Sequence, residues 1–500
     1  MAACYLVMSR SGKKVPRAAL ELPLRTMSSD SKNVLTNGGT IEGVWVFTRH
    51  GDRTPSRPLC ASHMVDTEAA FWRTKLPQPE SAHPFKVLTE LFPAEFHPSN
   101  GGQFQDVLRY PFGFLTRVGV DQLQRNGKRF FIRYDHYGHH CDLPPTDRRG
   151  NRFLDSWEVK AYSTNYLRTV TSVQCFLDGL LGTNLYTHPQ GQESTEEEEI
   201  PHHDTATRPE QSDGQVSVVV RDRTKDILNA FDRRPDLMMS LVSRVVDSAS
   251  FIERDAVAAP LAARLANFLP GLTRKGRKTF GGPSAINWID ASDHFVCRSA
   301  HSVKYSRFSA FEHDDRVEQT MSAMAHQTIA HLSWRFRQWY QYAPLLAELA
   351  APPLREILSQ MTDAVHLPKQ ERHPFVVYSC HDVTILGLLY AIGADFLGDE
   401  DKGEWRFWPA YATTLVFELV RIGNENERDT HVVRVLLNGK AIISANLVDL
   451  FSGKVTDIEY VGNGPSRMLR LADFEEVVKQ LEGFRVDEDL APGSSASDEH

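Results

Sequence analysis

The chain has 500 residues, of which 41% are hydrophobic and 24% charged, and its 56 basic against 64 acidic residues give a net charge of −8. This length exceeds a usual single core and predicts one large α/β domain with a sizeable insertion, or two domains, while no apolar run approaches the roughly 18 residues of a membrane span. The negative charge argues against general nucleic-acid binding and favours a small-molecule partner.

Residues 1–40 are rich in basic and serine residues and contain few acids. We expect a disordered or targeting segment that resembles a mitochondrial transit peptide. The apolar part of residues 1–8 is too short for a secretory signal, so the expected location is intracellular, either cytoplasmic or mitochondrial.

Residues 44–47 are hydrophobic at every position, which predicts a strand buried on both faces of a parallel sheet. The strand leads into Arg49, His50 and Arg53, which would lie beyond its carboxyl end, where such sheets bind ligands. Because guanidinium groups bind the oxygens of a phosphomonoester in a fixed planar geometry, Arg49 and Arg53 are candidate phosphate ligands.

Two helices are expected next. The apolar period from Leu115 predicts a helix that ends near Tyr134. Ser163 or Thr164 can cap a second helix that stops at Gly182, and its first turn would carry Arg168. A third arginine near a helix N-terminus favours anion binding, although a surface salt bridge is an equally good interpretation of Arg168 alone.

The middle of the chain changes composition twice. Residues 183–222 form a polar, acidic stretch that predicts an exposed disordered loop, and residues 223–365 show helical patterns that we interpret as an inserted helical cap. We expect Trp334, Phe336 and Trp339 to lie in the core of this cap, with the lining of an apolar substrate pocket as the alternative.

A second apolar strand, residues 374–380, ends in His381 and Asp382, and Asp382 stands where a helix N-cap is expected. Residues 413–420 and 432–437 predict strands, the second followed by an Asn438-Gly439 hairpin turn. Residues 41–182 and 366–484 would thus form an α/β core, and residues 485–500 a disordered tail.

Six cysteines in so long a chain do not indicate a disulfide framework, and we expect Cys175 and Cys380 to act as small buried hydrophobic residues. Residues 135–142 contain ligand types suited to zinc but without a recognised spacing, so a surface loop is the preferred interpretation. His202 and His203 lie in the acidic stretch and are expected to be solvated. No metal site is expected.

The string from Arg49 to Pro55 resembles the RHGxRxP signature of the histidine acid phosphatases, branch 2 of the histidine phosphatase superfamily, and His381-Asp382 resembles the second signature. Further similarity, in order along residues 43–481, lies in the following places: Leu115-Thr116 with Gly119 and Gln122, Ser163 to Thr169, Asp293 to His301, Tyr411 to Thr413 and Val433 to Gly439. The resemblance implies a phosphoglycerate-mutase-like α/β three-layer sandwich with a mainly parallel central sheet and an inserted helical cap.

The resemblance also implies roles. His50 would be the nucleophile that forms a phosphohistidine, and Asp382 would be the proton donor. The phosphoryl oxygens would be held by Arg49, Arg53, Arg168 and His381. Neither a metal nor another cofactor would be required, and a donor that must start protonated favours an acidic optimum.

The substrate is open at this stage. Asn165 differs from the Asp common at that position in secreted acid phosphatases and is similar to the lysophosphatidic acid phosphatase group, so lysophosphatidic acid is one expectation. The alternatives are a phytase or phosphosugar phosphatase of the same fold, or a non-catalytic protein that binds a phosphorylated ligand. A phytase should display a strongly basic pocket, and the expected cap has no evident basic cluster beyond residues 274–278. A mutase of branch 1 is disfavoured, because it would place its acid early, on a Glu.

Overall fold

The computed structural model describes residues 39–77, 87–88, 110–135, 152–182, 216–273, 286–309, 311–367, 371–394, 397, 407–422, 430–442 and 468–486. Most of the expected N-terminal segment, the acidic stretch to residue 215, the histidine-rich loop after Asp135, the basic residues 274–278 and the tail after residue 486 lie outside these ranges. No helix in the described ranges is long and apolar enough to cross a membrane.

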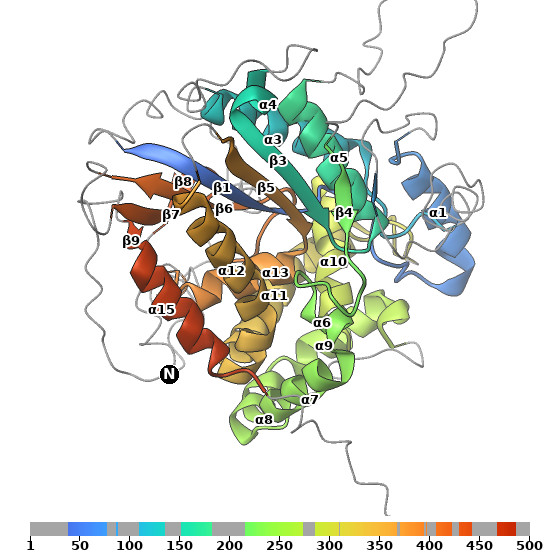
Figure 1. Ribbon diagram of the computed structural model, residues 1–500. Helices are drawn as coiled ribbons and strands as arrows, with labels where there is room; N and C mark the ends of the chain where they lie inside the picture. The colour runs from blue at the N-terminus through green and yellow to red at the C-terminus, as the bar shows by residue number, and fades with distance from the viewer. Residues whose placement is uncertain are drawn as a thin grey trace, which may run out of the picture. The chain divides into compact units, whose positions relative to one another are not determined.

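The described residues form one nine-stranded sheet in the order β2-β4-β3-β5-β1-β6-β7-β8, with β9 paired to β7 (Figure 1). The strands are β1 (Thr40–Arg49), β2 (Val87–Leu88), β3 (Trp157–Ser163), β4 (Val218–Val220), β5 (His373–Cys380), β6 (Thr414–Arg421), β7 (His431–Leu437), β8 (Lys440–Ala441) and β9 (Leu469–Arg470). The pairs from β2 to β1 are parallel, and those from β1 onward are antiparallel. The α/β fold expected from the sequence is confirmed, and its sheet is mixed because the C-terminal strands return as neighbours in hairpin fashion.

The helices of the first half are α1 (Val65–Arg73), α3 (Arg117–Tyr134), α4 (Arg152–Ser156), α5 (Leu167–Leu181), α6 (Ala230–Arg233), α7 (Pro235–Val246) and α8 (Ala249–Ala256). They are followed by α9 (Ala259–Phe268), α10 (Trp288–Ala300), α11 (Asp315–Tyr340), α12 (Ala343–Val365), α13 (Asp382–Ala391) and α15 (Leu471–Glu482). Two 3₁₀ helices cover Ser62–Met64 and Pro270–Thr273.

Alternate residues of β5 show that helices cover both faces of the sheet. The Phe375 ring packs on Phe130 of α3, and the Ser379 hydroxyl donates a hydrogen bond of 2.8 Å to a backbone oxygen of α5. Tyr378, which points to the opposite face, donates to Glu356 of α12 at 2.7 Å and stacks on Phe47 of β1. Because successive side chains of a strand point to opposite faces, α3 and α5 lie on one side of the sheet and α12 on the other.

The expected division into an α/β core and a cap at residues 223–365 stays a prediction. Helix α12, at the end of that range, contacts β1, α13 and α15. Phe336 and Trp339 of α11 are buried and Trp334 is half-buried, all within the main hydrophobic cluster, as expected for core residues.

Several local expectations are confirmed. Helix α3 ends at Tyr134 as expected, although it begins at Arg117 after a Thr116 cap rather than at Leu115, and Gly182 ends α5 in the left-handed conformation at φ 69°. Asn438 and Gly439 both have positive φ, 50° and 80°, as a tight hairpin turn between β7 and β8 requires. Cys175 and Cys380 are fully buried without disulfide partners.

Two expected helix caps are wrong. Strand β3 continues through Ser163, and the N-cap position of α5 is Tyr166, which makes no side-chain capping hydrogen bond. The hydroxyl of Thr164 instead lies 3.1 Å from Nε2 of His381. Asp382 is the first residue of α13 rather than its N-cap, because the extended backbone of His381 precedes the helix.

Candidate functional site

All six residues singled out from the sequence come together at the carboxyl ends of β1, β3 and β5. The parallel pairing of Arg49 with Cys380 places His50 and His381 side by side, with ring centroids 5.7 Å apart. Arg168, in the first turn of α5 after β3, lies 3.5 Å from Nδ1 of His381. Parallel strands bring segments far apart in the chain to the same edge of a sheet, so the topology assembles the site.

His50 is almost fully buried, with 2% of its surface exposed, and its Nδ1 lies 2.9 Å from the carbonyl oxygen of Gly51. A carbonyl can only accept, so Nδ1 carries the ring proton and the lone pair lies on Nε2. Burial, followed by the positive charges of Arg168 and the other site arginines, lowers the pKa of His50 well below its usual range. The neutral form of the imidazole is therefore favoured.

Arg49 is held in three ways. Its Nη1 donates to the backbone oxygen of Pro409 at 2.5 Å, its Nη2 lies 2.7 Å from Oδ2 of Asp382, and its guanidinium lies over the Tyr411 ring at 4.4 Å. With 3% exposure, the group is in place before any anion arrives. Such preorganisation reduces the entropy lost when a ligand binds.

Arg53 is fixed by Asp293 of α10. The two terminal nitrogens of Arg53 lie 2.8 and 3.1 Å from the two carboxylate oxygens, and the backbone N–H of Ser56 donates to the same carboxylate at 2.7 Å. Burial acts to lower the pKa of Arg53, but the charge of Asp293 outweighs it and holds this pKa well above its usual value. The bidentate contact fixes the plane of the guanidinium as well as its position.

Arg168 packs against the aromatic ring of Tyr166. Its guanidinium sits 4.5 Å from the Tyr166 ring centroid, and the Tyr166 hydroxyl turns away to donate to Asp232 at 2.8 Å. Burial and the charge of Arg53 lower the pKa of Arg168 to about 10, so it remains protonated at neutral pH. Three arginines thus meet at this site, two of them paired with Asp382 and Asp293, and together they are suited to binding an anion.

His381 has a defined tautomer. Because Arg168 can only donate, Nδ1 of His381 must accept, and the ring proton therefore lies on Nε2, which faces the Thr164 hydroxyl at 3.1 Å. Burial and the three site arginines lower the pKa of His381 well below its usual range. In this structure the ring is a neutral donor at Nε2.

Asp382 faces the cations with one oxygen and its own helix with the other. Besides Arg49, its Oδ2 accepts from Nε1 of Trp408 at 3.2 Å, and Oδ1 accepts from the backbone N–H of Val383 at 2.9 Å. Its side chain is 21% exposed, more than that of its ion-pair partner Arg49. A partly exposed carboxyl beside the site arginines is accessible to both ligand and solvent.

The backbone of the loop from His50 to Arg53, here called the His loop, passes very close to α3. A Cβ atom on Gly119 would lie 2.3 Å from the carbonyl oxygen of Asp52, and one on Gly51 would lie 2.6 Å from the carbonyl oxygen of Gly119. Only glycine allows both approaches, and Ser172 of α5 adds a hydrogen bond of 3.1 Å to the Gly51 N–H. The His loop is thereby pressed onto the helices that carry Arg168 and Thr116.

Four contact residues received no role in the site from the sequence, where Thr164 was expected only as a helix cap: Thr164, Asp293, Trp408 and Tyr411. Asp293 and Tyr411 belong to segments that resemble the family, but nothing in their local pattern marks them as partners of Arg53 and Arg49. Trp408 packs edge-on against Phe336 of α11, with centroids 5.1 Å apart, and so links Asp382 to the core of the helical region. A single sequence contains no signal that pairs residues so far apart.

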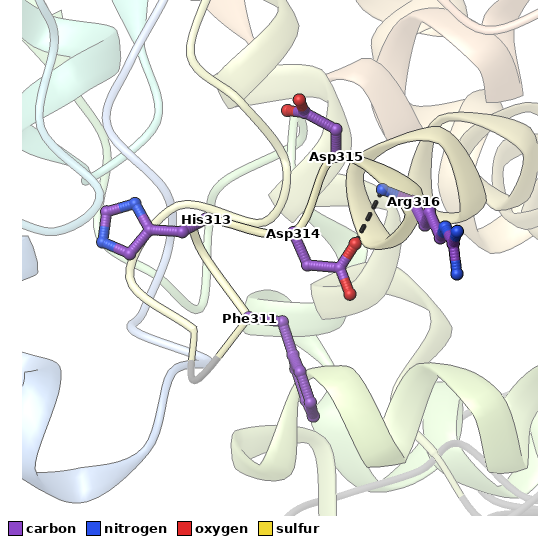
Figure 2. A pocket seen from close by; sticks show the side chains of 5 residues that line it. All are labelled: Phe311, His313, Asp314, Asp315 and Arg316. Atoms are coloured by element: carbon purple, nitrogen blue, oxygen red, sulfur yellow. Dashed lines mark hydrogen bonds between the residues drawn. The ribbon is translucent and has the colours of Figure 1, made fainter.

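Other features of the described chain do not add chemistry. An open pocket of about 560 Å³ lies at the start of α11, lined by Phe311, His313, Asp314, Asp315 and Arg316 (Figure 2). In it Asp314 accepts a hydrogen bond of 2.8 Å from the Arg316 N–H. It contains none of the six site residues. No group of three or more His, Cys, Asp or Glu side chains suited to a metal ion occurs within the described ranges.

Comparison with solved structures gives fold similarity at low identity. The apo form of a Bifidobacterium longum multiple inositol polyphosphate phosphatase has a TM-score of 0.51 at 12% identity, covering 88% of this chain and 92% of that one. A phytase from Citrobacter braakii has a TM-score of 0.47 at 14% identity (89% and 98% covered), and the apo Hafnia alvei phytase 0.46 at 14% (90% and 99%). Similarity at such identity is evidence for a shared fold only.

Sequence comparison is more decisive. Among curated proteins no match was found. The family described as "Histidine phosphatase superfamily (branch 2)" matches residues 40–438, a range that includes all six site residues. This chain therefore belongs to branch 2 of the histidine phosphatase superfamily, the histidine acid phosphatases, which are phosphoric monoester hydrolases.

Proposed function

We propose that this protein hydrolyses phosphate monoesters through a phosphohistidine on Nε2 of His50. The observation that carries the proposal is a buried imidazole whose proton is held on Nδ1 and whose pKa is lowered, surrounded by three arginines. A neutral imidazole nitrogen can attack phosphorus without first losing a proton. Cations fixed around the phosphoryl group stabilise the charge that spreads over its oxygens in the transition state.

Arg49, Arg53 and Arg168 would hold the phosphoryl oxygens, together with His381. In this proposal His381 donates its Nε2–H to a phosphoryl oxygen in place of Thr164, to which it now lies within 3.1 Å. Both histidines are neutral, so each keeps the protonation state that its role needs. The route uses no metal or other cofactor, because the arginines supply the positive charge.

Asp382 would act first as an acid and then as a base. Its protonated carboxyl donates to the oxygen of the departing alcohol while the P–O bond breaks, and the resulting carboxylate then takes a proton from the water that attacks the phosphohistidine. Since Arg49 is bound to Asp382 in this structure, a phosphate that engages Arg49 competes directly with the carboxylate. That competition would bring the carboxyl within reach of the ester oxygen.

For the substrate, we propose a small phosphorylated molecule, with an inositol polyphosphate as the first candidate. This candidate is supported by the similarity in fold to the Bifidobacterium longum multiple inositol polyphosphate phosphatase. The activity that this name states is that protein's own. Against it, the outer Arg57 is already paired with Asp290 at 3.3 Å, and Tyr166 is turned toward Asp232, so the described rim balances basic and acidic groups. A phosphosugar is the next candidate; no comparison supports lysophosphatidic acid.

The test is phosphate release by the purified chain and its His50→Ala variant from inositol hexakisphosphate, a phosphosugar, lysophosphatidic acid and an aryl phosphate. We expect wild-type turnover of at least one ester and loss of activity in the variant. Quenching in alkali with radiolabelled substrate should trap an alkali-stable, acid-labile label on the wild-type chain only. Equal activity in both proteins would overturn the nucleophile assignment. Phosphate binding by an inactive wild type would favour the non-catalytic alternative.

A further inference from the structure

One face of α10 runs along the back of the His loop. Asp293, Cys297 and His301 stand four residues apart, a spacing that places side chains on the same side of a helix, and His301 is the residue at its C-terminal cap. Asp293 holds Arg53, and Cys297 lies 3.1 Å from the Tyr411 hydroxyl. The third residue of the row, His301, reaches Asp52, which directly precedes Arg53 and follows His50 by two residues.

Asp52 is a buried carboxylate with few partners. It is completely inaccessible to solvent, and its Oδ2 accepts from the hydroxyl of Thr116 and lies 2.6 Å from Nε2 of His301. The contact between His301 Nε2 and Asp52 Oδ2 is close but lacks hydrogen-bond alignment, and Oδ1 has no hydrogen-bond partner among the described residues. A buried carboxylate is costly unless donors or cations face it; the Thr116 hydroxyl is one such donor, and the His301 imidazole, 2.6 Å from Oδ2, is a second polar group in contact with it.

The backbone of Asp52 is anchored at the same point. Its N–H donates to Oε1 of Gln122 at 2.8 Å, and its carbonyl accepts from the N–H of Thr116 at 2.9 Å. Since Asp52 directly precedes Arg53 and follows His50 by two residues, a shift of Asp52 would move both. Asp52 also occupies the position that the RHGxRxP pattern leaves unspecified, so the pair it forms with His301 is not part of that motif.

His301 is itself enclosed from α1. It is 5% exposed at its side chain, and the Trp72 ring packs edge-on against it with centroids 5.5 Å apart. Next to it, Arg298 of α10 is bound to Glu68 of α1 at 2.6 Å, which fixes the end of α10 against that helix. The imidazole is therefore held rigidly where it can only face Asp52.

We propose that His301 is a positioning residue for phosphoryl transfer, which acts through Asp52. Together with Asp293, His301 gives α10 two contacts with the His loop, one with the carboxylate of Asp52 and one with the guanidinium of Arg53. These two contacts would fix the orientation of the His50 imidazole relative to the guanidinium of Arg53. This inference rests on the proposed phosphatase activity and extends it to a helix that touches no substrate.

The test compares His301→Ala, His301→Gln and a matched control. The control is His331→Ala, because His331 also forms a buried pair with an aspartate, at 3.0 Å from Asp255, and packs on a tryptophan, Trp288, in the helical region. For each protein we would measure kcat, KM, the Kd of inorganic phosphate by calorimetry, and the melting temperature. Small displacements of catalytic groups can cost up to about 100-fold in rate.

We expect His301→Ala to lower kcat roughly 10- to 100-fold and to weaken phosphate binding several-fold. His301→Gln, whose amide can donate to Asp52, should recover most of both, and His331→Ala should lose melting temperature with kcat and phosphate affinity unchanged. Wild-type kcat and phosphate Kd in His301→Ala would overturn the inference. An equal loss of kcat in His331→Ala at the same loss of melting temperature would also overturn it. An inactive wild type would instead refute the proposed function, and the phosphate Kd would still test the positioning pair.

Discussion

Replacing Asp382 with Asn is the sharpest test of the proposed acid. The amide is nearly the same size and keeps an oxygen that can accept from the Val383 N–H, which the carboxylate accepts at 2.9 Å. It loses the ability to donate and take back a proton, and it loses the charge that faces Arg49 at 2.7 Å. The substitution therefore separates proton transfer from shape.

The two losses differ in size. Because the Asp382 side chain is 21% exposed, its ion pair with Arg49 contributes about 1 kcal/mol or less to stability. Removing a general acid costs roughly 10²- to 10⁴-fold in rate, which corresponds to about 2.7 to 5.4 kcal/mol of activation free energy. The kinetic effect should thus exceed the effect on folding. Phosphate affinity should stay the same or rise, since Arg49 no longer has a competing carboxylate.

The assay is steady-state hydrolysis of an alkyl phosphate and an aryl phosphate by wild type and variant, together with thermal unfolding. An alkoxide leaves poorly without a proton, whereas a phenolate needs less help, so kcat/KM should fall much more for the alkyl ester. An alkyl-ester kcat/KM within a few-fold of wild type would refute the proton-donor role. Equal losses for both esters would assign Asp382 an electrostatic role only.

Burial and the site arginines hold the pKa of His50 low, so removing one cation by Arg168→Ala should raise this pKa. Because the neutral imidazole is the reactive form, the acid limb of the pH profile of kcat/KM should move to higher pH. An acid limb at its wild-type position would contradict this cause. Gly119→Ala should lower both melting temperature and activity, since its Cβ would lie 2.3 Å from the Asp52 carbonyl oxygen; unchanged kinetics would show that the His loop tolerates displacement. Burial acts to raise the pKa of Glu418, but its arginine partners outweigh burial and lower this pKa. The ionised Glu418 therefore stabilises the fold above the pKa that it has in the unfolded chain, and this stability is lost as the pH falls through its lower pKa in the folded protein. Glu418→Gln should therefore lower the free energy of unfolding by about 3–5 kcal/mol at neutral pH, a difference that narrows in acid; a pH-independent difference in denaturant titrations would argue against the ion pair as its source.

Local sequence patterns correctly predicted those elements whose conformation follows from neighbouring residues alone. The wholly apolar residues 44–47 lie in a strand buried on both faces, and the Asn438-Gly439 pair forms the turn that its backbone preferences favour. The failed cap of α5 shows the limit: Thr164 has a hydroxyl suited to capping, but His381 and Thr169 lie close enough to bond it instead. A propensity yields when a buried tertiary partner is available, because an unsatisfied buried polar group costs more than a missing cap.

The candidate site likewise contains some residues that a local motif identifies and others that only the folded structure reveals. Arg49, His50 and Arg53 are neighbours in the chain, so their spacing was visible as a motif, and the structure places Arg168 and His381 beside them. Their supporting contacts were not visible. Asp293 meets Arg53 across 240 positions, and no periodicity or spacing rule relates residues so far apart.

The sequence by itself determined the family, the strand that carries the His loop and the residue types that can bind and attack a phosphate, because these depend on local order along the chain. Only the tertiary structure decided how those groups are held: which nitrogen of His50 is available, which carboxylate orients Arg53, and which helix supports Asp52. These properties arise from burial and from charges brought together by the parallel pairing of β1, β3 and β5. Electrostatic interactions depend on distance and solvent exclusion, which exist only once the chain has folded.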